Sequence, residues 1–302
     1  MATENLRYLF NPESVAVIGA SNKKGKLGYE IVENLVEYGY KGKIYPINPR
    51  HAEILGLTVY PSVLDVPDSV DLAIIAVPAK IVSSVLEQCG RKGVKAVVVI
   101  ASGFGEIGEK EMEKKLVEVA SKHGMCLLGP NVFGVISPPN KLNASFGPRN
   151  VLPGNIAFIT QSGALGIAII DWAIQQKIGL SAVVPLGNKA HVDDADLLEY
   201  FLEDKNTKSI VIYLEGVRDG RRFLAVATRV VRKKPVIVIK AGRSPRGASA
   251  AASHTGSLAG SDQVFSAAAD QAGLIRAFTL EEAFDYAKVV STTPKPWGRN
   301  VV

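Results

Sequence analysis

"VAVIGASNKKGKLG" (residues 15–28) is the stretch that decides the fold. A short β-branched run ends in glycine, a loop of small and basic residues follows, and Ile31, Leu35 and Val36 then recur at helical spacing. This order predicts a strand, a tight turn and a helix. It is the opening unit of a parallel α/β sheet, whose ligands bind at the carboxyl ends of the strands.

The same alternation continues through the chain in two cycles. Further strands are expected at 43–48, 71–78, 96–102 and 126–130, and then at 155–160, 180–187, 209–216 and 235–242. Helices are expected between them and near 261–271 and 280–290. Residues 131–154 are rich in Pro, Gly and Asn and suit a crossing segment between domains. Apolar strands separated by helices predict an α/β fold with two doubly wound parallel-sheet domains.

Composition excludes several classes of protein. The 302 residues are 47% hydrophobic and 21% charged, and no apolar run is long enough to cross a membrane. The N-terminus carries no signal-peptide pattern, so we expect a cytoplasmic protein. The net charge of +6 comes from scattered basic residues, so it does not require that the protein bind nucleic acid. A small polyanionic ligand accounts for this charge equally well. Cys89 and Cys126 have no C-x-x-C partner and are expected to be buried thiols.

The loop after the first strand is expected to bind a phosphate, because its small residues let backbone amides approach the ligand. Ser21 replaces the second glycine of G-x-G-x-x-G, and the second strand ends in Asn48 and Arg50 rather than in an acidic residue, so NAD is disfavoured. Basic residues here suit coenzyme A or NADP, although surface lysines beside a structural turn would look the same. The candidate ligand-binding residues are Gly19, Ser21, Lys24, Lys26, Asn48 and Arg50, with Val77, Pro78, Ser102 and Gly103 at two later strand ends.

The second cycle begins with "FITQSGALG" (158–166), which delivers a strand into Gln161, Ser162 and Gly163 at the start of a helix. Unpaired amides there favour an oxyanion, and the alternative is a capping serine with a packing glycine. Glu215 ends an apolar strand, where α/β enzymes hold catalytic carboxylates.

"AASHTGSLAGSD" (251–262) places His254 among alanines, glycines and short hydroxyl side chains. A histidine on such a loop, near a phosphate site and a carboxylate, can accept a phosphoryl group and pass it on. Taken alone it would be an ordinary surface histidine. The other histidines are assigned no chemistry, and the four together lack metal-ligand spacing, so no metal site is expected.

Several motifs occur together and in order: "SVAVIGAS", "GFGEIG", "GPN", "QSGALG", "GNKA", "DLLEY", "KAGRS" and "SHTGSLAGSD". By these the chain resembles the α subunit of nucleoside-diphosphate-forming acyl-CoA synthetases, most closely the ADP-forming acetyl-CoA synthetases of archaea, which are relatives of succinyl-CoA synthetase. The likeness covers essentially the whole sequence.

The resemblance implies a Rossmann-like CoA-binding domain at 1–130, the crossing segment at 131–154, a flavodoxin-like phosphohistidine domain at 155–292 and the start of a linker at 293–302. It implies that His254 is phosphorylated, that Glu215 stabilises the phosphohistidine, and that residues Gln161, Ser162, Gly163 and Ala164 hold phosphate. Family enzymes convert acetyl-CoA, ADP and phosphate into acetate, CoA and ATP. The partner would be an ATP-grasp β subunit with Mg²⁺ and ADP or ATP, in an α2β2-type assembly.

The chain departs from the family pattern at three places. Val132 and Phe133 stand after "GPN", where Cys-Leu is usual, and are expected to alter the acyl pocket; His191 follows "GNKA", where Asp is common. Neither an ATP-grasp segment nor a third α-type domain is present, so this chain alone is not expected to make ATP. A non-catalytic CoA-sensing or assembly module remains the alternative. An NADP-dependent oxidoreductase is disfavoured, since no hydride-transfer residues are evident.

Overall fold

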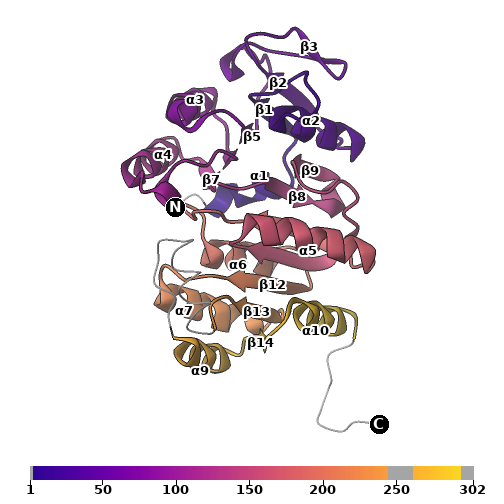
Figure 1. Ribbon diagram of the computed structural model, residues 1–302, viewed down its shortest axis with the longest axis vertical. Coiled ribbons are helices and arrows are strands. Elements are labelled where there is room, and N and C mark those ends of the chain that lie inside the picture. The colour runs from indigo at the N-terminus through magenta and orange to yellow at the C-terminus, as the bar shows by residue number, and fades with distance from the viewer. Residues whose placement is uncertain (1–2, 244–260, 294–302) are drawn as a thin grey trace.

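The computed structural model describes residues 3–243 and 261–293 (Figure 1). After η1 (Thr3–Leu6) and α1 (Arg7–Phe10), the first half builds a parallel five-stranded sheet in the order β2-β1-β5-β6-β7. Its strands are β1 (Ser14–Ile18), β2 (Lys43–Ile47), β5 (Leu72–Ile75), β6 (Ala96–Val99) and β7 (Cys126–Leu128). Its helices are α2 (Leu27–Glu37), α3 (Ala79–Lys92) and α4 (Lys110–Lys122). The smaller elements are β3 (Glu53–Ile54), β4 (Leu57–Thr58), η2 (Val63–Asp65) and η3 (Gly105–Ile107).

The second half is a seven-stranded sheet in the order β14-β13-β12-β10-β11-β8-β9, of which the first five strands run parallel. These five are β10 (Pro153–Thr160), β11 (Leu180–Pro185), β12 (Ser209–Leu214), β13 (Val236–Lys240) and β14 (Ile275–Ala277). The helices are α5 (Gly163–Gln175), α6 (Asp194–Glu203), α7 (Gly220–Val231), α9 (Asp262–Ala272) and α10 (Leu280–Thr292). The predicted fold class, two α/β halves each built on a parallel sheet, is confirmed.

The segment expected to cross between the domains, residues 131–154, contains an ordered hairpin that the sequence did not predict. β8 (Gly134–Ser137) and β9 (Leu142–Ser145) pair antiparallel around η4 (Pro138–Asn140), and β8 pairs with β11. Each strand is only four residues long, and the two prolines of η4 lie between the strands, so the turn-forming residues concealed the short buried strands. Asn34 of α2 donates hydrogen bonds to Ser145 O (2.8 Å) and Gly147 O (3.0 Å), which joins the hairpin to the first half.

The two halves share one apolar core. A single cluster of buried residues runs from Val17 and Leu72 in the first sheet through Val135 in the hairpin to Ala157 and Ile210 in the second sheet. Figure 1 shows the two sheets stacked along the long axis of the molecule, with β8 and β9, at one edge of the second sheet, on the side nearest the first half. The loops that follow the strands of both sheets are therefore held in a fixed relation to one another. In the described part of the chain, none of the helices is long and apolar enough to span a bilayer.

Candidate functional site

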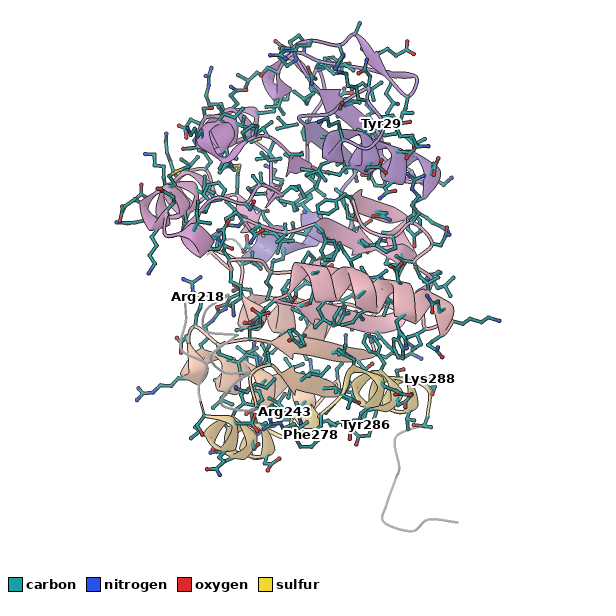
Figure 2. All side chains as sticks on the ribbon, viewed as in Figure 1. Tyr29, Arg218, Arg243, Phe278, Tyr286 and Lys288 are labelled. Atoms are coloured by element: carbon teal, nitrogen blue, oxygen red, sulfur yellow. The ribbon has the colours of Figure 1, made fainter. Side chains whose placement is uncertain are left out.

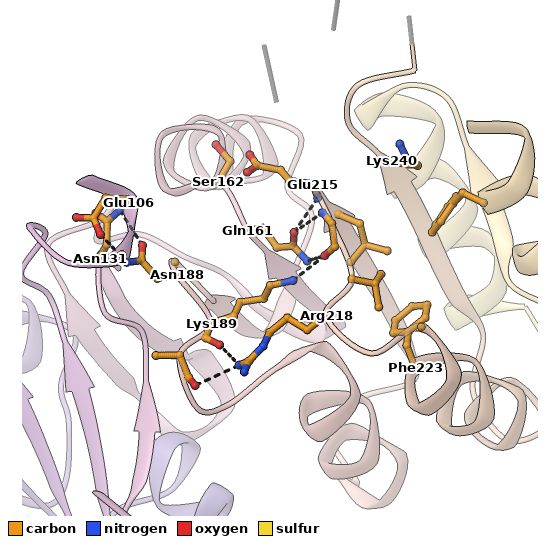
Figure 3. A pocket seen from close by; sticks show the side chains of 18 of the residues that line it. Glu106, Asn131, Gln161, Ser162, Asn188, Lys189, Glu215, Arg218, Phe223 and Lys240 are labelled. Carbon is orange, nitrogen blue, oxygen red and sulfur yellow. Dashed lines mark hydrogen bonds between the residues drawn. The ribbon is translucent and has the colours of Figure 1, made fainter. Parts of the chain in front are cut away.

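A cavity of about 1480 Å³ lies where the loops of the two halves face each other (Figure 3). From the first half it is lined by η3 and α4, through residues such as Glu106 and Glu113. From the second half it is lined by the carboxyl ends of β10, β12 and β13 and by the start of α5. The structure therefore brings the predicted phosphate-binding residues and Glu215 to one cavity.

Gln161, directly after β10, uses its whole side-chain amide to tie three elements together. Its Oε1 accepts the backbone N–H groups of Glu215 (2.8 Å) and Gly216 (3.0 Å), and its Nε2 donates to Asp194 Oδ1 and Gly216 O (both 2.9 Å). Its own backbone N–H donates to Tyr213 O (3.2 Å). The two donors and two lone pairs of the amide are thus all engaged, and any direct contact with phosphate requires one of these hydrogen bonds to break.

A buried ion pair supports the same corner of the cavity. Lys189 Nζ donates to Asp194 Oδ2 (3.0 Å) and to Gly216 O (2.6 Å), and the two side chains are 10% and 3% exposed. Arg218, at the rim between the two halves (Figure 2), donates to the backbone carbonyls of Lys189 and Ala190. A buried ammonium and carboxylate are tolerated only when paired and hydrogen-bonded in this way. The sequence motif "GNKA" does not reveal a role for Lys189, because the partners of Lys189 lie on other elements.

The start of α5 has the properties expected of an anion site. Ser162 is its N-cap and accepts the Leu165 N–H (3.4 Å), while its own N–H donates to Thr160 Oγ1 (3.1 Å). Among the described residues, the amides of Gly163 and Ala164 have no acceptor, as the first amides of a helix have none within it. A β-carbon on Gly163 would meet nothing within 4 Å, so space remains beside these amides. The helix dipole adds a positive potential here.

Glu215 follows β12 and is 8% exposed. Figure 3 shows its carboxylate directed toward the start of α5, near Ser162. Its backbone is held by Gln161, as described above. The arrangement places a buried carboxylate beside unpaired amides, which is suited to orienting an imidazole whose other nitrogen acts as a nucleophile. His254 itself lies outside the described residues.

The first half meets the site through a polar contact at the mouth of the cavity. Asn188 Nδ2 donates to carboxylate oxygens of Glu106 and Glu113, the latter at 2.7 Å, and its Oδ1 accepts from Asn131 (3.4 Å). Glu106 also accepts the backbone N–H groups of Gly103 and Phe104. Burial acts to raise the pKa of Glu106, but the hydrogen bonds from Asn188 and these amides outweigh it and hold the pKa below its usual value. This contact was not predicted from the sequence.

The residues predicted to bind CoA gather at the carboxyl edge of the first sheet. Gly19, with φ +91°, donates to Ile47 O (3.0 Å), and a β-carbon on it would lie 2.4 Å from Ala76 O. Asn48 Nδ2 donates to Ala20 O (2.7 Å), which joins the ends of β1 and β2. The remaining predicted residues lie on the same edge, half-buried or exposed: Ser21, Lys24, Lys26, Arg50, Val77, Pro78, Ser102 and Gly103. None of them is among the described residues that line the cavity.

The residues at which the chain departs from the family pattern are buried or half-buried. Val132 and Phe133 are 4% and 2% exposed, and neither is among the described residues that line the cavity; Phe133 packs against Gly166 of α5. His191 Nδ1 accepts the Leu127 N–H (3.3 Å) across the two halves, and burial lowers the pKa of this imidazole. The expectation that Cys89 and Cys126 are buried is confirmed. Three or more potential metal ligands do not gather anywhere within 3–243 and 261–293.

Comparison with known proteins gives the class of this fold and site. A CoA binding domain matches residues 13–138, and a succinyl-CoA ligase like flavodoxin domain matches residues 153–290. The chain is 31% identical over 238 residues to a succinate–CoA ligase [ADP-forming] subunit alpha of Archaeoglobus fulgidus, covering 76% of this chain and 78% of that protein. The chain belongs to the family of α subunits of ADP-forming CoA ligases.

Within this family the chain is more similar to acetate–CoA ligases. It is 63% identical to the acetate–CoA ligase [ADP-forming] I subunit alpha of Pyrococcus furiosus, over 99% of this chain and 66% of that subunit. The structure of a dinucleotide-forming acetyl-coenzyme A synthetase from Ca. Korarchaeum cryptofilum, in complex with phosphate and ADP, superimposes with a TM-score of 0.94 at 53% identity. That match covers 97% of this chain and 64% of the other. The chain thus spans about two thirds of the length of these relatives.

Proposed function

We propose that this chain is the α subunit, or an α-subunit fragment, of an ADP-forming acetate–CoA ligase. It would bind CoA and relay a phosphoryl group through His254 in acetyl-CoA + ADP + phosphate ⇌ acetate + CoA + ATP. The observation that supports this most directly is the cavity in which Glu215 and the free amides at the start of α5 face the first half. The division into a CoA-binding domain up to residue 130 and a phosphohistidine domain at 155–292 is part of the proposal.

In the proposed mechanism, a phosphate held by Ser162 and the amides of Gly163 and Ala164 attacks the thioester carbonyl carbon. The carbon–sulfur bond breaks, CoA leaves as its thiolate, and an acyl phosphate forms. A ring nitrogen of His254 then attacks phosphorus and the carboxylate leaves. Glu215 accepts the N–H of the other ring nitrogen, which fixes the tautomer and offsets the imidazolium charge.

Within this proposal Gln161 acts by position rather than as a phosphate ligand, since all of its side-chain hydrogen-bonding capacity serves Glu215, Gly216 and Asp194. The predicted residues at the edge of the first sheet would hold CoA, with Lys24, Lys26 and Arg50 exposed to meet its phosphates. Mg²⁺ and ADP or ATP are assigned to an ATP-grasp β subunit in an α2β2-type assembly, and the location is taken as cytoplasmic.

The relay is tested by incubating the chain and its ATP-grasp partner with γ-labelled ATP. Wild type should acquire acid-labile, alkali-stable label, His254→Ala should acquire none, and label that persists in His254→Ala would refute the relay. Glu215→Gln should shorten the phosphoenzyme lifetime by about 10- to 100-fold, because it weakens a charge-assisted hydrogen bond worth about 1.5–3 kcal/mol. Binding of CoA without phosphorylation from any donor would favour the alternative CoA-sensing module.

A further inference from the structure

Lys240 is a second buried lysine of the cavity, and unlike Lys189 it has no carboxylate within ion-pair distance among the residues that the structure describes. It ends β13, is 6% exposed and lines the cavity. Its Nζ donates one hydrogen bond, to Ala241 O (3.1 Å), and among the described residues it forms no ion pair. Lys189, which is 8% exposed in the same cavity, has a carboxylate partner in Asp194. Burying an ammonium without a counter-charge is costly, and burial accordingly lowers the pKa of Lys240.

Lys240 lies on the other face of the second sheet from the start of α5. Side chains alternate between faces along a strand. Val236 and Val238 belong to the core cluster that contains residues of α7 and α9, whereas Ile237 and Ile239 belong to the cluster that contains residues of α5 and α10. Lys240 therefore follows Val238 onto the α7 and α9 face.

The neighbouring strand repeats this alternation. Lys240 is paired with Leu214 of β12, which lies in the cluster on the α7 and α9 face. Glu215, the next residue, is directed to the opposite face, where α5 begins. Figure 3 shows Lys240 on the cavity wall away from Ser162 and Glu215. The ammonium of Lys240 is thus separate from the phosphate site already described.

The start of α9 supplies further donors to this side of the cavity. Ser261, its N-cap, lines the cavity and makes no side-chain capping hydrogen bond. The first intrahelical hydrogen bond is donated by Phe265 N–H to Ser261 O (3.0 Å), so the amides of residues 262–264 precede it and have no acceptor among the described residues. The nearby carboxylate of Asp262 does not satisfy Lys240, because it is paired with Arg276 (2.5 Å). Arg243, the next basic residue along the chain, makes a different contact, because its guanidinium carbon lies 5.2 Å from the centre of the Phe278 ring (Figure 2).

We propose that Lys240 and the start of α9 form a second oxyanion subsite, which takes a phosphoryl group on the face of the sheet opposite Glu215. A buried cation combined with unpaired helix-start amides is the chemistry that holds phosphate oxygens. The bound group would be either inorganic phosphate or a phosphate of a nucleotide. This inference does not depend on the His254 relay.

The test observes the Lys240 ammonium directly, by ¹⁵N NMR of lysine Nζ groups in the full chain, with the Lys240 signal assigned from Lys240→Arg. Lys234 is the matched internal control, because it is also a partly buried lysine with a lowered pKa bound to backbone carbonyls, Phe201 O and Asp204 O, but does not line the cavity. Inorganic phosphate should move the Lys240 signal saturably and raise its pKa while the Lys234 signal stays in place. A response to ADP alone would assign the subsite to a nucleotide phosphate and also support the inference.

The variant arm measures phosphate affinity. Since Lys240→Met removes the observed signal, phosphate binding to the variants is measured by calorimetric titration. Lys240→Met should weaken phosphate binding by about tenfold, as expected for loss of one charge-assisted hydrogen bond, while Lys234→Met should leave it unchanged. A Lys240 signal that responds to neither phosphate nor ADP would overturn the inference. Labelling of His254 in the same preparation reports separately on the proposed relay, so either idea can fail while the other stands.

Discussion

Gln161→Met should destabilise the protein by about 2–4 kcal/mol, although methionine fills nearly the same volume. The change removes four hydrogen bonds. Asp194 and Gly216 O each keep Lys189 as a donor, so the cost falls on the amide N–H groups of Glu215 and Gly216, which lose their acceptor. A buried orphaned amide costs about 1–3 kcal/mol, and Gly216 is only half-buried, which gives the range stated.

The measurement is urea denaturation of the variant and of wild type, together with hydrogen exchange at the amides of Glu215 and Gly216, which should quicken. Gln88→Met is the matched control: Gln88 is partly exposed and accepts a single hydrogen bond, from Ser62 Oγ (3.0 Å), so its loss should cost about 1 kcal/mol or less. Equal destabilisation by the two variants, with unchanged exchange at Glu215, would show that Gln161 does not hold this corner of the cavity.

Three further predictions concern buried ionisable groups. Lys189→Met should cost about 3–5 kcal/mol in denaturation experiments, because it strands the buried carboxylate of Asp194, and a loss below about 1 kcal/mol would contradict this. Burial lowers the pKa of His191, so the unfolded chain binds the proton more readily than the folded chain. The contribution of His191 to the free energy of unfolding should therefore be complete above pH 6.5 and should decrease as the pH falls below it. The pH dependence of stability in His191→Gln, titrated in parallel, should lack this contribution. Burial raises the pKa of the Cys89 thiol to about 12, so it should resist a thiol-specific reagent at pH 8 in the native state and react on unfolding.

The sequence predicted those features of the fold and of the site that depend on neighbouring residues within one element. Apolar runs ending in small residues located the core strands, and Ser162 before Gly163 was identified as a helix start because capping depends on neighbouring residues. Glu215 was placed at a strand end because the apolar run of β12 stops just before it. Such features require only the order of residues along one element.

What the sequence could not provide depends on contacts between distant segments. The hairpin of β8 and β9 is stabilised by packing on α2 and by pairing with β11, neither of which leaves a periodic signal in a four-residue strand. The hydrogen bonds of Gln161 could not be predicted for a similar reason. Next to Ser162 it reads as a phosphate ligand, and only the positions of residues 194 and 216 show that its side-chain amide makes hydrogen bonds to them.

The alignment of the two halves and the geometry of Glu215 depend on the same short segment. Residues 188, 190 and 192 donate backbone hydrogen bonds to Pro130 O (3.0 Å), Gly129 O (3.1 Å) and Leu127 O (3.2 Å), at the end of the last strand of the first sheet. Between them, Lys189 reaches Gly216 O, next to Glu215. Because alternate residues of one segment contact the first half and the backbone next to Glu215, we expect any change in the distance between the two sides of the cavity to move Glu215 as well.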